Sequence, residues 1–155
     1  MVYFALSVKK IYKPHYFKSI VNNNKYLHMF QNWFWQRYLD TAEYKKYYFQ
    51  QDGASPHTSN LVQDCLHQKF GTKFLSKEKW PPRSLDLNPC DFFLWGYLKS
   101  KVYHPLPSNI EELKANIDRE IKSINADMLK NSFENFRKRL ELIESAEGGR
   151  IENVL

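Results

Sequence analysis

The chain has 155 residues, of which 43% are hydrophobic and 16% aromatic, and it carries a formal net charge of +6. This length is enough for one domain with a buried core, and the apolar content excludes a disordered chain. The longest apolar run falls far short of the ~20 residues that a membrane span needs, and the N-terminus lacks the pattern of a secretory signal. Two cysteines, Cys65 and Cys90, form neither a disulfide framework nor a zinc motif, which fits a reducing compartment.

The positive charge is concentrated in the first two thirds of the chain. Residues 1–100 carry 14 Lys and Arg against 7 Asp and Glu, a balance of +7, whereas residues 101–155 carry 9 against 10, a balance of −1. A basic surface of this kind fits a polyanionic partner such as nucleic acid. Ordinary solvation of a lysine-rich surface accounts for the charge equally well.

The first elements in chain order are predicted to be two strands and a helix. Residues 2–8 form an apolar run typical of a buried strand, and residues 11–20 are predicted as a second strand, in which Pro14 favours an edge or a bulge. Residues 26–39 are predicted to be helical. Their apolar face is formed by Leu27, Phe30, Phe34 and Tyr38.

The middle of the chain alternates between predicted strands and helices. Residues 47–49 are aromatic and β-prone, and Asp52 follows them where glycine and proline break the chain. Residues 59–70 are predicted as a helix that ends at Gly71, and residues 73–75 as a short strand. The inward side of this helix is expected to hold Leu61, Val62, Cys65, Leu66 and Phe70.

A second carboxylate lies where another helix begins. Asn88 is a good N-cap and Pro89 suits the first helical position, so Asp91 falls in the first turn of a helix that runs to about Val102. One carboxylate at a strand end and another at a helix start, facing one cleft, would suit a divalent ion such as Mg²⁺. Two such ions clamp the attacking and leaving oxygens of a phosphoryl displacement.

Two amphipathic helices are predicted at the end of the chain. Ser108 and Glu111 have the spacing of a capping box before the first, and Asp127 is expected to cap the second. The apolar positions are Ile110, Leu113, Ile117, Ile121 and Ile124, followed by Leu129, Phe133, Phe136, Leu140 and Ile143. We expect packing and assembly elements here, with binding of a partner as the alternative.

Several motifs in this order resemble the catalytic domain of mariner-type DDE/DDD transposases. They are the run QDGASPH from Gln51, the run WPP from Trp80 and the run LNPCDFFLWGYLK from Leu87. The resemblance implies an α/β fold: a ribonuclease-H-like sheet with flanking helices, truncated at its N-terminus, plus a C-terminal helical pair. Residues 1–104 would be the partial catalytic domain, and residues 105–155 its helical extension.

The resemblance assigns the two carboxylates as catalytic metal ligands for Mg²⁺ or Mn²⁺. Asp52 matches the second catalytic acid of the family and Asp91 the third, with 38 residues between them. A turn aspartate and a helix-capping carboxylate are the corresponding structural alternatives. Asp86 is the rival for the third position, with 33 residues between it and Asp52. It matches a different motif position, so Asp86 and Asn88 are expected to shape the loop.

Three further side chains are candidates for contact with nucleic acid. By the resemblance, His57 contacts DNA or supports the metal ligands, and an ordinary loop histidine is the alternative. Lys79 and Arg83 could meet phosphates, and exposed solubilising charge is the alternative.

The first catalytic acid of the family has no counterpart in the chain. Only Asp40 and Glu43 are acidic before Asp52, both follow the predicted helix of residues 26–39, and no acid lies in residues 2–8. We therefore expect a transposase-derived DNA endonuclease and strand-transfer domain that is incomplete, and weakly active or inactive alone. The alternative is a non-catalytic DNA- or protein-binding remnant. The resemblance also implies DNA as partner, a homodimer, no membrane and the nucleus.

Overall fold

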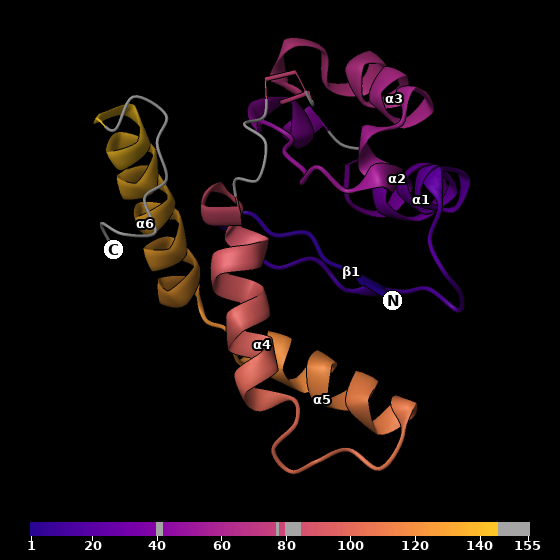
Figure 1. Cartoon of the computed structure of the whole chain (residues 1–155), viewed down its shortest axis with the longest axis vertical. Coiled ribbons are helices and arrows are strands. Elements are labelled where there is room, and N and C mark those ends of the chain that lie inside the picture. Colours follow the sequence, from indigo (N-terminus) through magenta and orange to yellow (C-terminus); the bar gives the residue numbers. More distant parts are fainter. Residues whose placement is uncertain (40–41, 77, 80–84, 146–155) are drawn as a thin grey trace. The chain divides into compact units, whose positions relative to one another are not determined.

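The computed structural model describes most of the chain, and the residues it describes are 1–39, 42–76, 78–79 and 85–145, with only the backbone at 42, 43 and 85. Two compact units are present (Figure 1). The first consists of Met1 with Phe17–Ser84, and the second of Val2–Tyr16 with Leu85–Leu155. The extents of these units differ from the predicted regions 1–104 and 105–155, and that division into domains stays a prediction.

The first unit is mainly helical. Its elements are α1 (Asn23–Met29), the π-helical η1 (Phe30–Leu39), η2 (Ala42–Lys46), α2 (Ser55–Thr58), α3 (Asn60–Phe70) and η3 (Gly71–Lys73). Asn22 begins α1, because its Oδ1 accepts the N–H of Lys25 at 2.9 Å. Gly71 ends α3 with a φ of +56°, a conformation that glycine adopts without a steric penalty.

The predicted helix over residues 26–39 is confirmed, but its buried side differs from the expected one. Leu27 and Tyr38 are half-buried, whereas the fully buried residues are Tyr26, Met29, Phe30, Phe34 and Leu39. A π-helix bonds residues five apart and turns less per residue than an α-helix. Spacings of four and five therefore bring Phe30, Phe34 and Leu39 to one side.

The predicted strands of the first unit are reduced to one parallel bridge, between Phe49 and Phe74. The N–H of Phe49 donates to the carbonyl of Lys73 at 2.9 Å, and the N–H of Leu75 donates to the carbonyl of Phe49 at 3.0 Å. The Phe49 ring also stacks on Phe70 at a centroid distance of 4.7 Å. The segment that leads to Asp52 is thereby fixed against the end of α3.

The inward side of α3 is largely as predicted. Val62, Cys65 and Leu66 are buried, but the expectation for Leu61 is wrong, since 47% of its surface is exposed. Gln63 is buried instead, and its amide donates to the backbone carbonyl of His57 within α2. An apolar pattern does not identify a polar residue that is buried by a specific hydrogen bond.

The second unit begins with a two-stranded antiparallel sheet. β1 (Val2–Tyr3) pairs with β2 (His15–Tyr16), and Leu6 and Ile11 form an isolated bridge between them. The predicted strands over residues 2–8 and 11–20 are therefore wrong in length. Proline lacks the N–H that a ladder needs, so Pro14 limits pairing beside β2. Within the described residues this pair is the one sheet of two or more strands, smaller than the predicted one.

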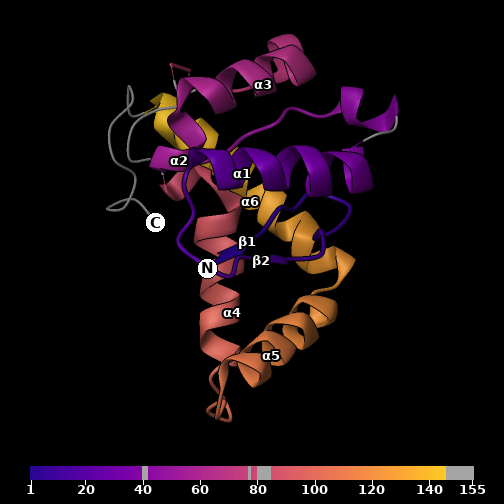
Figure 2. The ribbon, with the colours of Figure 1, turned by 90° about the vertical axis from the view of Figure 1, so that its right-hand side faces the viewer.

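Most of the remaining described residues of the second unit are helical. The helices are η4 (Leu85–Leu87), the π-helical η5 (Cys90–Trp95), α4 (Gly96–Lys101), α5 (Ile110–Ser123) and α6 (Ala126–Ser145). The predicted helix from Pro89 to about Val102 corresponds to η5 followed by α4. α4 and α5 leave the loop that joins them in different directions (Figure 2). The core of this unit consists of Phe4, Leu94, Leu98, Val102, Ile124 and Leu129.

The capping residues of the last two helices differ from the predicted ones. Asn109 caps α5 in place of Ser108, because its Oδ1 accepts the N–H of Glu112 at 2.9 Å. Asn125, not Asp127, bonds the first turn of α6, where its Oδ1 accepts the N–H of Met128 at 2.9 Å.

Two predicted core positions of these helices are exposed, Ile110 at 62% and Leu140 at 43%. No helix among the described residues is long and apolar enough to cross a bilayer.

Candidate active site

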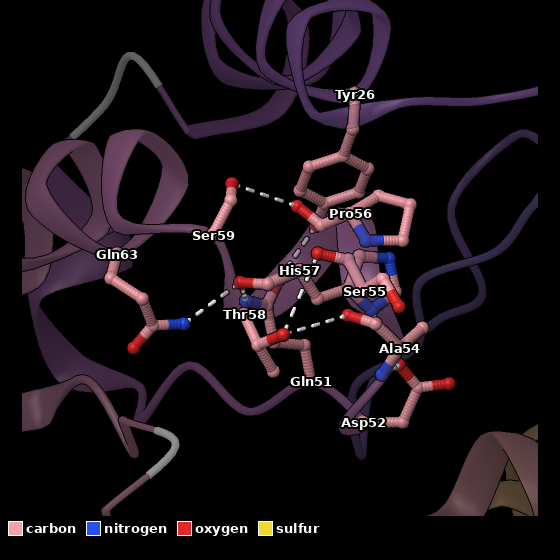
Figure 3. Close-up of polar contacts among 10 residues, drawn as sticks. All are labelled: Tyr26, Gln51, Asp52, Ala54, Ser55, Pro56, His57, Thr58, Ser59 and Gln63. Atoms are coloured by element: carbon pink, nitrogen blue, oxygen red, sulfur yellow. Dashed lines mark hydrogen bonds and ion pairs between the residues drawn. The ribbon is translucent and has the colours of Figure 1, made fainter.

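Asp52 lies between the Phe49 bridge and α2, at the point where the chain turns (Figure 3). Its Oδ1 accepts the N–H of Ala54 at 3.1 Å, which is the bond expected of a turn aspartate. The same oxygen lies 2.5 Å from Nδ1 of His57, in the first helical turn that follows. Oδ1 of Asp52 therefore makes both the backbone hydrogen bond of the turn and the contact with the His57 side chain.

The surroundings of Asp52 favour its charged form. The hydrogen bond from His57 lowers the pKa of the Asp52 carboxyl, and the charge of His57 and the Ala54 N–H act in the same direction. Partial burial opposes them but is outweighed. The side chain of Asp52 is 40% exposed and that of His57 is 19% exposed. Asp52 is consequently an anion at neutral pH that a cation can reach from solvent.

His57 is held by three side chains that the sequence did not single out for this role. The ring of Tyr26 contacts the His57 ring at a centroid distance of 4.4 Å, and its hydroxyl donates to Oε1 of Gln51 at 2.8 Å. Nε2 of Gln51 and Nε2 of Gln63 both donate to the carbonyl of His57, at 2.9 and 2.8 Å. Gln51 adjoins Asp52 in the QDGA motif, whereas Tyr26 and Gln63 carry no local signal.

The second oxygen of Asp52 is available for a ligand. Among the residues that the structure describes, none donates a hydrogen bond to Oδ2, and Figure 3 shows this oxygen pointing away from the turn. A partly exposed, ionised carboxylate oxygen is the type of ligand that Mg²⁺ and Mn²⁺ prefer. Asp52 thus fits one position of a divalent metal site.

Asp91 lies in the second unit, in the first turn of η5. Its N–H donates to the carbonyl of Asn88 at 2.8 Å, and Oδ1 of Asn88 accepts the N–H of Cys90 at 3.1 Å. Asn88 therefore begins this helix and Pro89 follows it, as the sequence predicts. The Asp91 side chain is half-buried and its Oδ2 is buried.

Asp86, the rival acid, belongs to an ion pair. NH1 of Arg139 on α6 donates to Oδ1 of Asp86 at 3.1 Å, and the two side chains are 14% and 29% exposed. This contact occupies one oxygen of Asp86.

Lys79 and Arg83 are the remaining predicted contacts with nucleic acid. Lys79 is exposed and follows a turn in which its N–H donates to the carbonyl of Ser76 at 3.0 Å. Arg83 lies outside the described residues. The structure brings Asp52 together with His57, whereas Asp52 and Asp91 belong to different units.

A group of three or more metal-binding side chains is absent from the described parts of the chain. Asp40 lies outside the described residues, and the side chain of Glu43 is not described. The two predicted metal ligands that the structure describes are single carboxylates, Asp52 in one unit and Asp91 in the other.

The fold is that of a transposase catalytic domain. The chain aligns with the solved structure of the Mos1 transposase catalytic domain with Raltegravir and Mn at a TM-score of 0.81 and 18% identity, over 97% of this chain and 76% of that one. With the Mg-containing structure of the same domain, the TM-score is 0.71 at 20% identity over the same shares. This ribonuclease-H-like fold agrees with the fold class that the motifs predict, in its coarse form.

The sequence comparison leads to the same class. The chain is 32% identical over 153 residues to Tc3 transposase of Caenorhabditis elegans, which covers 97% of this chain and 45% of that protein. No family model matches the chain. The chain is thus homologous to somewhat less than half of a transposase, and its resemblance to the catalytic domain of mariner-type transposases is confirmed.

Proposed function

We propose that these 155 residues act in DNA transposition as part of a transposase catalytic domain that cleaves and joins DNA strands. The observation that carries this proposal is the similarity to Tc3 transposase over 97% of the chain. Because the chain spans less than half of that protein, the activity and the DNA substrate are inferences from it.

Asp52 and Asp91 are each proposed as a ligand for a divalent ion, Mg²⁺ or Mn²⁺. The motif positions of both residues support this assignment, as do the lowered pKa and the available Oδ2 of Asp52. The Mos1 catalytic domain has been solved with each of these two metals. When bound, such an ion activates the attacking hydroxyl and offsets charge on the phosphate.

The other candidate residues have supporting roles in this proposal. His57 holds Oδ1 of Asp52, so that Oδ2 would be the oxygen that binds the metal. Lys79 and Arg83 would contact DNA phosphates, and such contacts orient DNA without reading its sequence. Asp86 and Asn88 shape the loop before Asp91, through the ion pair with Arg139 and the cap of η5.

We further propose that these residues alone cleave DNA weakly or not at all. A two-metal reaction needs enough carboxylates to set the metal spacing and to neutralise charge. Because these carboxylates act together, loss of one of them lowers the reaction rate by more than a proportional amount. Before Asp52 the chain has only Asp40 and Glu43 as acids, and both follow η1 in sequence.

A second candidate is a DNA-binding remnant without catalysis. The excess of 14 Lys and Arg over 7 Asp and Glu in residues 1–100 favours it, together with the absence of a three-ligand group among the described residues. Both candidates place the chain on DNA, in the nucleus and as a homodimer, and they differ in metal dependence.

Plasmid nicking with Mg²⁺ and with Mn²⁺ separates these candidates. We expect slow nicking or none by the chain, together with DNA binding that weakens as salt rises. Any nicking should disappear in Asp52→Ala and in Asp91→Ala but persist in Asp64→Ala, which removes an exposed acid on α3. Nicking that survives both Asp52→Ala and Asp91→Ala would contradict the residue assignment, and a lack of DNA binding would contradict both candidates.

A further inference from the structure

Arg139 of helix α6 contacts the segment around Asp91 on two sides. NH1 of Arg139 donates to Oδ1 of Asp86 at 3.1 Å and lies 3.5 Å from the carbonyl oxygen of Asp86. Nε of Arg139 donates to Oδ1 of Asn135 at 3.1 Å, which fixes the guanidinium on its own helix. The carbon of the guanidinium lies 4.5 Å from the centroid of the Phe92 ring.

These contacts lie on both sides of Asp91 in the sequence. Asp86 precedes the cap residue Asn88, and Phe92 directly follows Asp91. Asn88 bonds the N–H groups of the first turn that carries Asp91. Arg139 thus holds the chain just before this turn through Asp86, and the turn itself through Phe92.

The burial of Arg139 distinguishes it from an ordinary surface arginine. Its side chain is 14% exposed, whereas the side chain of Arg137 on the same helix is 83% exposed and pairs with Glu141. A planar guanidinium can bond a carboxylate with its edge and stack on a ring with its face, which an ammonium cannot do. Both kinds of contact are made by Arg139.

We propose that Arg139 is a positioning residue for Asp91. It sets the direction of the Asp91 carboxylate by fixing the loop before η5 and the ring of Phe92, the residue that follows Asp91. This inference rests on the proposed function, because it assumes that Asp91 is a metal ligand. Residues that orient a ligand typically change metal affinity by about 10- to 100-fold when they are lost.

Mn²⁺ affinity of the whole chain tests the proposal, measured by electron paramagnetic resonance as the free Mn²⁺ signal. We expect Arg139→Ala to weaken Mn²⁺ binding about tenfold. Arg139→Lys should recover part of the loss, because charge is kept while the stacking on Phe92 is lost. Arg137→Ala is the matched control and should leave the affinity unchanged. Asp86→Asn, which changes no volume, should weaken binding in the same way if Arg139→Ala does not fold.

A double variant separates positioning from general destabilisation. In an Asp91→Ala background the ligand is gone, so adding Arg139→Ala should weaken Mn²⁺ binding no further. Unchanged affinity in folded Arg139→Ala and Asp86→Asn would overturn the inference, and so would a further loss in the Asp91→Ala background. Mn²⁺ binding that is indifferent to Asp91→Ala itself would instead overturn the proposed function, and this inference with it.

Discussion

Asp52 and Asp91 are held in different ways. Asp52 is set by residues close to it in sequence, Ala54 and His57, on a turn that leaves one carboxylate oxygen accessible. Asp91 lies at the start of a helix, and the loop before it is bonded through Asp86 to Arg139, which lies 53 residues further along the chain. A short motif can therefore encode the surroundings of the first carboxylate, whereas those of the second depend on the fold of the unit.

The largest expected effects come from the core of each unit. Leu66 on α3 and Leu94 on η5 are both 0% exposed. Truncation of a fully buried leucine leaves a cavity, so Leu66→Ala and Leu94→Ala should each lower the free energy of unfolding by about 2–5 kcal/mol. Urea denaturation measures this loss. Leu61→Ala is the control for the first unit, since Leu61 is 47% exposed, and it should cost far less.

The cap of η5 should contribute less than the core. Asn88→Ala removes the acceptor of the Cys90 N–H, and loss of an N-cap costs about 1 kcal/mol. Asn131→Ala replaces an exposed asparagine within α6 and should be neutral or slightly stabilising, because alanine is the better helix former. Equal unfolding free energies for Asn88→Ala and Asn131→Ala, measured in urea, would contradict the dependence of the Asp91 surroundings on the cap.

The support of His57 should have a similar or smaller effect. Tyr26→Phe keeps the ring against His57 but removes the hydroxyl that bonds Gln51, and one hydrogen bond contributes about 0.5–1.5 kcal/mol net. Tyr48→Phe is the control, since Tyr48 is 66% exposed. Urea denaturation should show a loss for Tyr26→Phe alone. A loss of the same size for Tyr48→Phe would contradict the role assigned to the Tyr26 hydroxyl.

The smallest expected effect is the pH dependence that Asp52 adds. Its pKa in the folded chain lies below the unfolded value of about 3.9, so its carboxylate stabilises the fold above that pH. This contribution is lost as pH falls through the folded pKa. Asp52→Asn should therefore lose stability relative to the original chain at pH 7, and the difference should shrink at pH 3. A difference independent of pH would show that the charge of Asp52 has no such effect.

Sequence patterns predicted the helices better than their buried faces, because apolar spacing indicates a helix whereas packing in the fold decides which residues are buried. Residues 26–39 and 60–70 are helical, and the helix from Pro89 begins at the predicted cap. The strands were overpredicted, because aromatic and β-branched residues favour extended structure without fixing a partner. Phe49 and Phe74 illustrate this, since they form one bridge in place of two strands.

The site was predictable only where its contacts are local. Asp52 and His57 belong to one motif, and the structure places them 2.5 Å apart. Tyr26 lies 25 residues before Gln51 and Arg139 lies 53 residues after Asp86, so no local pattern could indicate either contact. The metal roles of Asp52 and Asp91 stay predictions.

Paramagnetic broadening by Mn²⁺ tests most directly whether Asp52 and Asp91 are metal ligands. Mn²⁺ is added in small substoichiometric steps to the ¹⁵N-labelled chain, and the amide signals of Gly53, Ala54, Cys90 and Phe92 are followed by NMR. We expect all four signals to broaden, Asp52→Asn to abolish the broadening at Gly53 and Ala54, and Asp91→Asn to abolish it at Cys90 and Phe92. Broadening that survives the substitution of the neighbouring carboxylate, or no broadening at any of the four amides, would contradict the metal roles of Asp52 and Asp91.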